Sequence, residues 1–282
     1  MYQLAFPAAE LAPYIESYWC VHATADVPLD LTVDVFVDLR ADLVFTFGAP
    51  YERGVAGGER ESIGRSNLDA QRSHPIQITQ RGEVSLVGVR FHAGGLSPFV
   101  VGPVQTWNDR VVDLAEVFSD DARTLEDKLR AAGSEMGRHA DNLNAFFASR
   151  LRISESYRVF QSLKEHLHAV PGDARMDELC ARRGVSQRQL DRLFRAHLGF
   201  SPKTYARVVR FQRALNQLKK DPGCTLADIA ARCGYYDQSH FVREFRAYAG
   251  TAPKARVGYF PAGAPADFAP NVVQFVQDRG SK

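Results

Sequence analysis

Features that mark secreted, membrane-spanning or zinc-binding chains are scarce in this sequence. Its 282 residues include only four cysteines, and none lies in a Cys-x-x-Cys pair or near a pair of histidines, which argues against a zinc site and for a reducing compartment. No run of 18 uncharged apolar residues exists, so we expect no membrane-spanning segment. The first seven residues lack the basic region and apolar run of a signal peptide. We therefore expect a cytoplasmic protein with no membrane partner.

The sequence also lacks the signatures of common enzyme classes. It contains no glycine-rich phosphate loop and no His-x-His pair, since its N-terminal histidines are scattered at His22, His74 and His92. A cupin-like metalloenzyme with a metal bound inside a small barrel is the enzyme alternative. Its carboxylates would come from three aspartates that we expect at strand edges and turns, Asp34, Asp38 and Asp42. We expect no enzyme activity, no cofactor and no metal site.

The small net charge of +2 conceals two halves of opposite sign. Residues 1–150 contain 13 Lys and Arg against 21 Asp and Glu, whereas residues 151–260 contain 20 against 10. An acidic front and a basic back indicate that only the back half meets a polyanion such as nucleic acid.

The pattern of apolar residues divides the chain in the same way. Strand-like runs occupy 33–38, 43–47, 76–79 and 83–91, with glycine-bearing loops between them. From about Asp109 the apolar spacing becomes helical. These patterns predict an α+β chain: a β-rich, barrel-like domain with packed helices over residues 1–152, an all-α domain over 153–260, and a tail over 261–282, in which 271–277 is expected to form a short strand or a docking segment.

An internal repeat is the most informative feature of the basic half. The segment from Met176 to Pro202 recurs in altered form from Leu226 to Pro253, with Gly184 matching Gly234 at a spacing of 50 residues. Later positions match at a spacing of 51, so the second copy has one extra residue after its turn. Repetition at this length predicts two copies of one structural unit.

Each copy has the pattern of a helix, a tight turn and a second helix. The two glycines can adopt the positive φ that ends a helix within a short turn. Ser186 with Gln189 forms a capping-box pattern, and Asp237 is a suitable N-cap for the second copy. Apolar residues then mark the inward face of each second helix. The outward faces present side chains that can read base edges or contact phosphates: Gln187, Arg188, Asp191, Arg192 and Arg195 in the first copy, and Gln238, Ser239, His240 and Arg243 in the second.

The segment between the copies is expected to be a linker helix. Ser201 and Pro202 form an N-cap followed by proline at the first helical position, and apolar residues continue at helical spacing to Lys220. Its length of roughly 27 Å suits two helices placed in successive major grooves about 34 Å apart.

This tandem arrangement resembles the DNA-binding domain of the AraC/XylS family of transcription regulators. The resemblance covers about 100 residues, and the stretch Ala230–Tyr235 with Phe241, Phe245, Gly250 and Pro253 is similar to the family's signature. It implies a regulator that binds double-stranded DNA, with RNA polymerase, a small-molecule effector and a second copy of the chain as further partners. The family's base-contacting positions fall on Arg188, Arg192 and the four residues named in the second copy. Asp191 falls on a position used at the DNA, where it would accept from cytosine or orient Arg188 or Arg192.

The N-terminal region has a weaker resemblance. Residues 87–95 and 107–114 are similar to the β-rich front domain of some AraC-type regulators, which implies effector binding or dimerisation. A sensor would have a closed pocket, for which we expect the lining aromatics Trp19, Phe36, Phe45, Phe47 and Phe91, although ordinary core packing also explains them. The alternative is that the domain serves only for dimerisation or protein docking.

Overall fold

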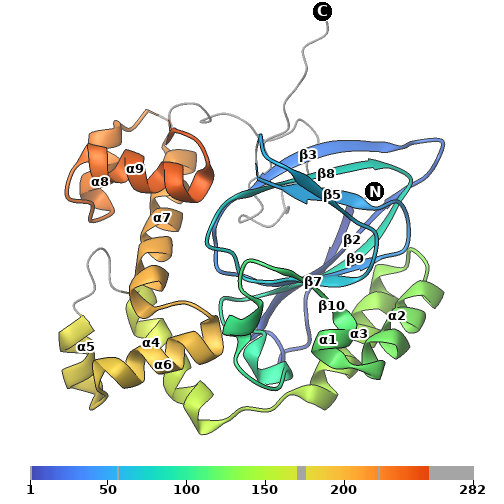
Figure 1. The fold of residues 1–282 in the computed structure, drawn as a ribbon, viewed down its shortest axis with the longest axis horizontal. Helices are drawn as coiled ribbons and strands as arrows, with labels where there is room; N and C mark the ends of the chain where they lie inside the picture. The colour runs from blue at the N-terminus through green and yellow to red at the C-terminus, as the bar shows by residue number, and fades with distance from the viewer. Residues whose placement is uncertain (1, 56, 170–175, 222, 254–282) are drawn as a thin grey trace, which may run out of the picture.

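The computed structural model describes residues 2–55, 57–169, 176–221 and 223–253. Figure 1 shows a β-rich half and a helical half that lie side by side. This is the α+β architecture that the sequence predicts. The expected tail, including residues 271–277, lies outside the described residues. Within the described ranges, no helix is long and apolar enough to cross a membrane.

Two antiparallel sheets form the N-terminal half. The first has the order β1-β2-β9-β4-β7-β10 and the second the order β3-β8-β5-β6. The strands are β1 (Tyr2–Ala5), β2 (Ile15–Ala23), β3 (Leu29–Val35), β4 (Asp42–Thr46), β5 (Tyr51–Gly54), β6 (Arg60–Ile63), β7 (Asn67–Asp69), β8 (Ile76–Gly82), β9 (Val84–Phe91) and β10 (Val111–Asp113). Every pair of neighbouring strands is antiparallel, and most of the paired strands are not consecutive in the chain.

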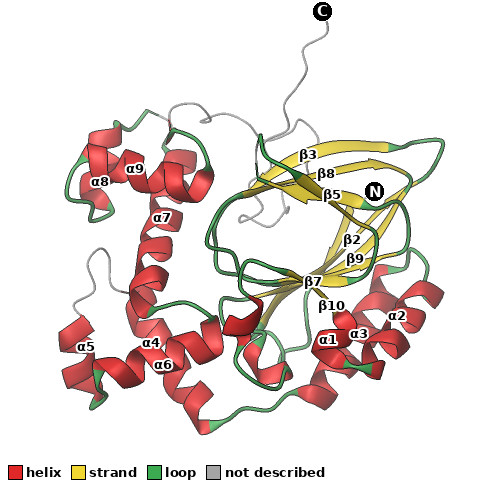
Figure 2. Cartoon of the chain, viewed as in Figure 1, coloured by secondary structure: helices red, strands yellow, loops and turns green. Residues whose placement is uncertain are grey.

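Three helices cover the outer face of the first sheet (Figure 2). They are α1 (Leu114–Phe118), α2 (Asp120–Ala131) and α3 (Met136–Arg150), and two 3₁₀ turns, η1 (Ser97–Phe99) and η2 (Val104–Trp107), precede them. Because alternate side chains of a strand point to opposite faces, odd-numbered residues of β9 such as Phe91 meet these helices. The Phe91 ring lies 5.6 Å, centroid to centroid, from that of Phe147 in α3.

The C-terminal half contains six described helices. They are α4 (Glu155–Ala169), α5 (Met176–Arg183), α6 (Gln187–Leu198), α7 (Pro202–Lys220), α8 (Leu226–Arg232) and α9 (Gln238–Ala249). Helix α7 runs between two groups, with α4, α5 and α6 at one end and α8 and α9 at the other (Figure 1). Its 19 residues give a rod of about 28 Å.

The two halves share one hydrophobic core. A single cluster of buried side chains extends from the first sheet into helices α4 to α9. Phe36, which follows β3, lies 6.2 Å from Phe211 of α7, measured between ring centroids. The helical half is therefore held against the β-rich half by apolar contact as well as by the hydrogen bonds described below.

Candidate nucleic-acid interface and inter-sheet cavity

The turns of the two repeats have the same geometry. Gly184 has φ 63° and Gly234 has φ 76°, so both occupy the left-handed region as the sequence predicts. The next residue donates its N–H to a carbonyl in the preceding helix, from Val185 to Cys180 at 3.1 Å and from Tyr235 to Ala230 at 2.9 Å. These bonds satisfy carbonyls left free at the helix end, and they make each unit a helix-turn-helix.

The second helix of each unit starts with a side-chain cap. Ser186 and Gln189 form both bonds of a capping box, and the Asp237 carboxylate accepts from the N–H of His240 at 2.6 Å. The extra residue of the second unit is Tyr236, which is 93% exposed between the turn and the cap. The N-caps that the sequence predicts for α6 and α9, Ser186 and Asp237, are thus confirmed.

Helix α6 presents its predicted cations to solvent. Arg188 and Arg192 are exposed near its start. The Asp191 carboxylate accepts from Nε of Arg195 at 2.6 Å, so it pairs with neither of the two arginines that we expected it to orient. Gln187 donates to Asp177 of α5 at 3.0 Å, which connects the two helices of the unit.

Helix α9 exposes three of its four predicted residues. Gln238, Ser239 and Arg243 are exposed, whereas the His240 side chain is only 31% exposed. The imidazole lies edge-on to the ring of Tyr235, with centroids 5.4 Å apart. His240 therefore packs on the protein more than it faces outward.

A buried ion cluster joins α9 to the linker helix. The Glu244 carboxylate accepts from Nη2 of Arg210 at 2.9 Å and from Nε of Arg207 at 2.8 Å. Burial alone would raise the pKa of Glu244, but these hydrogen bonds outweigh it and hold the pKa below its usual value. This cluster was not predicted from the sequence, because Glu244 lies 34 residues from Arg210 and 37 residues from Arg207.

The C-terminal ends of α6 and α9, which the sequence predicts to be the DNA-recognition helices, are bound to the β-rich half. Asn108 donates from its side-chain amide to the carbonyl of Gly199, directly after α6, at 2.6 Å. Val37 donates its N–H to the carbonyl of Tyr248 in the last turn of α9, at 3.1 Å. The N-terminal ends of α6 and α9 point away from the sheets (Figure 2).

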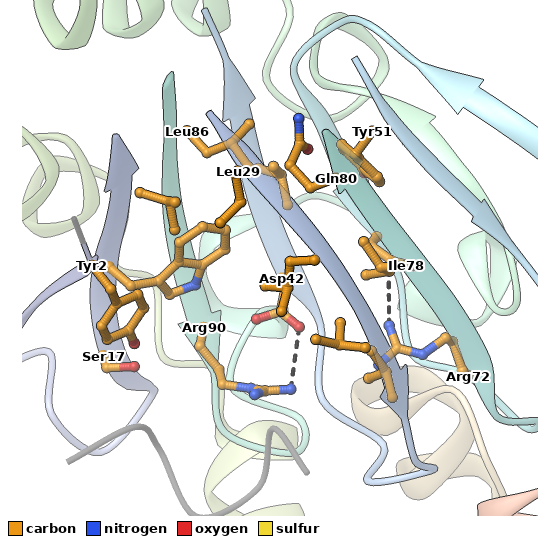
Figure 3. Close-up of a pocket in the computed structure, with 17 residues that line it drawn as sticks. Tyr2, Ser17, Leu29, Asp42, Tyr51, Arg72, Ile78, Gln80, Leu86 and Arg90 are labelled. Carbon is orange, nitrogen blue, oxygen red and sulfur yellow. Dashed lines mark hydrogen bonds and ion pairs between the residues drawn. The ribbon is translucent and has the colours of Figure 1, made fainter. Parts of the chain in front are cut away.

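A cavity of about 170 Å³ lies between the two sheets (Figure 3). Most of its wall is aliphatic, with Leu29 and Ile78 from the second sheet and Val44 and Leu86 from the first. At one end its lining becomes polar, with Ser17, Asp42, Arg72 and Arg90.

The polar end of the cavity is a buried ion network. Nη2 of Arg90 lies 3.0 Å from Asp38 and 3.4 Å from Asp42, and Nη1 of Arg72 lies 3.0 Å from Asp69. Burial raises the pKa of Asp42 to about 6, whereas three neighbouring arginines outweigh burial at Asp38 and lower its pKa. Asp38, in the loop between β3 and β4, and Asp42, at the start of β4, are therefore members of a buried ion network. Among the described residues, no group of three or more His, Cys, Asp or Glu is placed to hold a metal ion.

One of the five aromatics that we expected around a pocket lines this cavity. Trp19 does so, together with Tyr2 and Tyr51. Phe45 and Phe91 are buried in the shared core, because they alternate with the cavity-facing residues of their strands. Phe36 packs on α7, and Phe47 lies under the guanidinium of Arg130 at 4.7 Å. Trp19, Val44 and Leu86 face the cavity, so residues an odd number of positions away on the same strands face the shared core. This alternation is the sequence signal that distinguishes cavity-lining residues from core residues on these strands.

Two family descriptions match the chain. Residues 179–256 match a helix-turn-helix domain, and residues 3–113 match a domain of unknown function (DUF6597). The regulator GbdR of Pseudomonas aeruginosa is 37% identical over 90 residues, which cover 32% of this chain and 24% of GbdR. The transcriptional activator NphR of a Rhodococcus species is 26% identical over 220 residues, which cover 77% of this chain and 59% of NphR. The chain thus spans about a quarter of the first relative and about three fifths of the second.

A solved structure of apo ToxT from Vibrio cholerae is also similar, at 11% identity and a TM-score of 0.44, covering 85% of this chain and 96% of ToxT. The repeated units and the match over residues 179–256 show that the chain contains a helix-turn-helix domain, and its relatives GbdR and NphR are named as transcription regulators. These matches agree with the resemblance to the AraC/XylS family that the repeat carries.

Proposed function

We propose that this protein controls transcription by binding specific DNA sequences through α6 and α9. The observation that carries this proposal is the pair of matched units, in which the first two turns of the second helix present exposed Arg188 and Arg192 in α6 and exposed Arg243 in α9. Arginine forks bind guanine edges in the major groove. The linker rod of about 28 Å is compatible with two helices in successive grooves, about 34 Å apart.

The test is a selection of bound duplexes from a random library with the full chain, followed by a mobility shift. We expect one enriched sequence and a steep loss of affinity with salt, because phosphate contacts release counterions. The double variant Arg188→Ala/Arg192→Ala should no longer bind the enriched sequence more tightly than other duplexes. The control Arg81→Ala/Arg123→Ala removes the same amount of charge from the N-terminal half, and it should retain the preference for the enriched sequence. Equal binding of all duplexes, or equal losses for both double variants, would refute sequence-specific recognition through α6.

For the N-terminal half we propose control by a small molecule that binds in the inter-sheet cavity. The support is a largely aliphatic cavity adjacent to the segment that contacts α9. A ligand that binds only the folded state raises stability by mass action, so a thermal-shift screen tests the proposal. The alternative is a module for dimerisation or docking. Screening hits that leave DNA affinity unchanged, together with self-association in sedimentation, would favour that alternative.

The direction of regulation, the protein partners and the location of the chain are also proposed here. We propose activation, since NphR is named a transcriptional activator, and contact with RNA polymerase at the promoter. We further propose a cytoplasmic, non-enzymatic protein that acts as a homodimer. A reporter assay with the selected sequence tests activation, and analytical ultracentrifugation on that duplex tests the dimer.

A further inference from the structure

The inter-sheet cavity combines an aliphatic wall with unsatisfied cationic groups at one end. Nε and Nη2 of Arg72 and Nε of Arg90 have no hydrogen-bond partner among the described residues, and each residue is only 2% exposed. The hydroxyl of Ser17, which also lines the cavity, is buried without a partner in the same part of the structure. Buried donors without acceptors are costly, and they indicate a place where a ligand supplies the acceptors.

The charges around this end of the cavity balance, but one carboxylate is held more loosely than the others. The network contains equal numbers of cations and anions: Arg40, Arg53, Arg72 and Arg90 with Glu16, Asp38, Asp42 and Asp69. Asp69 has partners at 2.8 and 3.0 Å, and Asp38 has one at 3.0 Å. The one ion pair of Asp42 in the described structure spans 3.4 Å. Asp42 is therefore the anion that leaves the network most easily.

We propose that the cavity binds a compact, apolar monocarboxylate, whose carboxylate accepts from Arg72 and Arg90 in place of Asp42. This inference rests on the proposed effector role of the N-terminal half and names the class of effector. In Figure 3 the ligand's carboxylate would lie among Ser17, Arg90 and Arg72, and its hydrocarbon would lie towards Leu29 and Leu86.

The volume of the cavity suits a compact hydrocarbon part. An apolar cavity of about 150 Å³ accommodates benzene, so about 170 Å³ suits a ring or a chain of roughly six carbons. A cationic ligand would add to the arginines, and a neutral amide would satisfy fewer of their donors than a carboxylate does.

Binding of a carboxylate should take up a proton on Asp42. The groups that face Asp42 are Arg90, Asp38, Asp69, Arg72 and Tyr2. Its pKa of about 6 in the free protein must rise when a second carboxylate approaches the same arginines. Affinity should therefore increase as pH falls from 8 to 6, by up to about tenfold per unit, and level off below that. Carboxylic acids themselves remain ionised above about pH 5.

The experiment is calorimetric titration of the full chain at pH 6, 7 and 8. The probes are the straight-chain C4–C8 carboxylates and cyclohexanecarboxylate, each compared with its primary amide. We expect a carboxylate of about six carbons to bind with the pH dependence given above and its amide to bind weakly at every pH. Quenching of Trp19 fluorescence in a Trp107→Phe background reports the site, because Trp19 lines the cavity.

The variant Asp42→Asn permits a test by gain of affinity. It imitates the protonated carboxyl group, so at pH 8 it should bind the carboxylate at least tenfold more tightly than the unaltered chain and lose the pH dependence. Asp30→Asn makes the same change on an exposed aspartate paired with Arg81 and should behave like the unaltered chain. The pH series on the unaltered chain stands as a test if Asp42→Asn does not fold.

Binding of no carboxylate at pH 6, equal binding of the amides, or an Asp42→Asn variant that folds without tighter binding would each overturn the inference. A mobility shift with and without the carboxylate distinguishes it from the proposed function. Carboxylate binding that leaves DNA affinity unchanged supports the site and refutes its effector role. A neutral molecule that alters DNA affinity, with no carboxylate bound, refutes the ligand class and leaves the effector role standing.

Discussion

The two helix-turn-helix units share their turns and differ in what lies beneath their recognition helices. Both turns use a glycine with positive φ followed by the same backbone hydrogen bond. At the position where α6 has the half-buried Leu193, however, α9 has Glu244 in a buried cluster with Arg207 and Arg210. The comparison shows that the turn defines the unit, whereas the support of the recognition helix can be either apolar or ionic.

The units also differ in how the β-rich half holds them. A side chain, Asn108, caps the end of α6, whereas a backbone N–H, that of Val37, bonds to the end of α9. A substitution at Asn108 can therefore remove the hydrogen bond to α6 without changing the backbone, whereas no side-chain substitution removes the backbone bond to α9 in the same way. This asymmetry makes the roles of the two units experimentally separable.

The largest expected effect is on stability, in the second unit. Glu244→Gln leaves the charge of Arg210 buried without its anion and should lower the free energy of unfolding by about 3–5 kcal/mol. Asp191→Asn, which breaks the exposed pair of the first unit, should cost less than about 1 kcal/mol. Urea denaturation followed by circular dichroism measures both.

The pH dependence provides a second measurement on Glu244. Its pKa is lowered in the folded state, so its contribution is fully present above the unfolded value of about 4.3 and is lost as pH falls through the folded value. The difference between the unaltered chain and Glu244→Gln should therefore narrow below about pH 4. A constant difference would mean that the substitution acts by disturbing the packing around α9 and not by removing a charge.

The next effect is on DNA recognition. Arg192→Ala should weaken the selected duplex by about 1–3 kcal/mol relative to a scrambled duplex, since a bidentate contact to a base is lost. Arg243→Ala should cost less, because the extra Tyr236 places α9 differently after its turn. Competition binding at fixed salt compares the two. Equal losses on both duplexes would assign Arg192 to phosphate contact, and a larger loss for Arg243 would reverse the order of the units.

A smaller effect is expected at the end of α6. Asn108→Ala removes the hydrogen bond to Gly199 and should destabilise the chain by about 0.5–1.5 kcal/mol. Asn216→Ala, on an exposed position of α7, is the matched control. Hydrogen exchange should become faster in the last turn of α6 and stay unchanged in α9. Faster exchange in both helices would show that the β-rich half holds the units as one body.

The smallest effect is expected on the linker helix. Lys203 is exposed near the start of α7, where it can meet phosphate but not base edges. Lys203→Ala should weaken selected and scrambled duplexes equally and reduce the salt slope by about one. Loss confined to the selected duplex would place Lys203 among the groups that read sequence.

The sequence predicts the helical half closely, because its signals are local. A glycine turn, a capping box and an N-cap aspartate act within a few residues, and each has the predicted hydrogen bonds. Ser201 and Pro202 likewise begin α7 where expected. The fold class follows from the change of apolar period near Asp109.

The features that escaped prediction depend on contacts between distant residues. Asp38 and Arg90 are 52 residues apart, and only the pairing of β4 with β9 brings their segments together. The face to which Phe45 points depends on which side of its sheet the helices cover. For Glu244, the sequence contains the charge but not the identity of its partners on α7.

The adjacent residues Val37 and Asp38 connect the ion network at the end of the cavity to the helical half. The Asp38 side chain belongs to the ion network, while Val37 donates its N–H to Tyr248 of α9 and accepts at its carbonyl from Gln212 of α7 at 2.9 Å. If a ligand in the cavity shifts this peptide unit, binding of the ligand and binding of DNA become thermodynamically coupled. Whatever factor the occupant imposes on DNA affinity, DNA must impose on the affinity for the occupant. Promoter DNA would then act as an effector of the cavity, and a duplex added to the protein would change how tightly the small molecule is held.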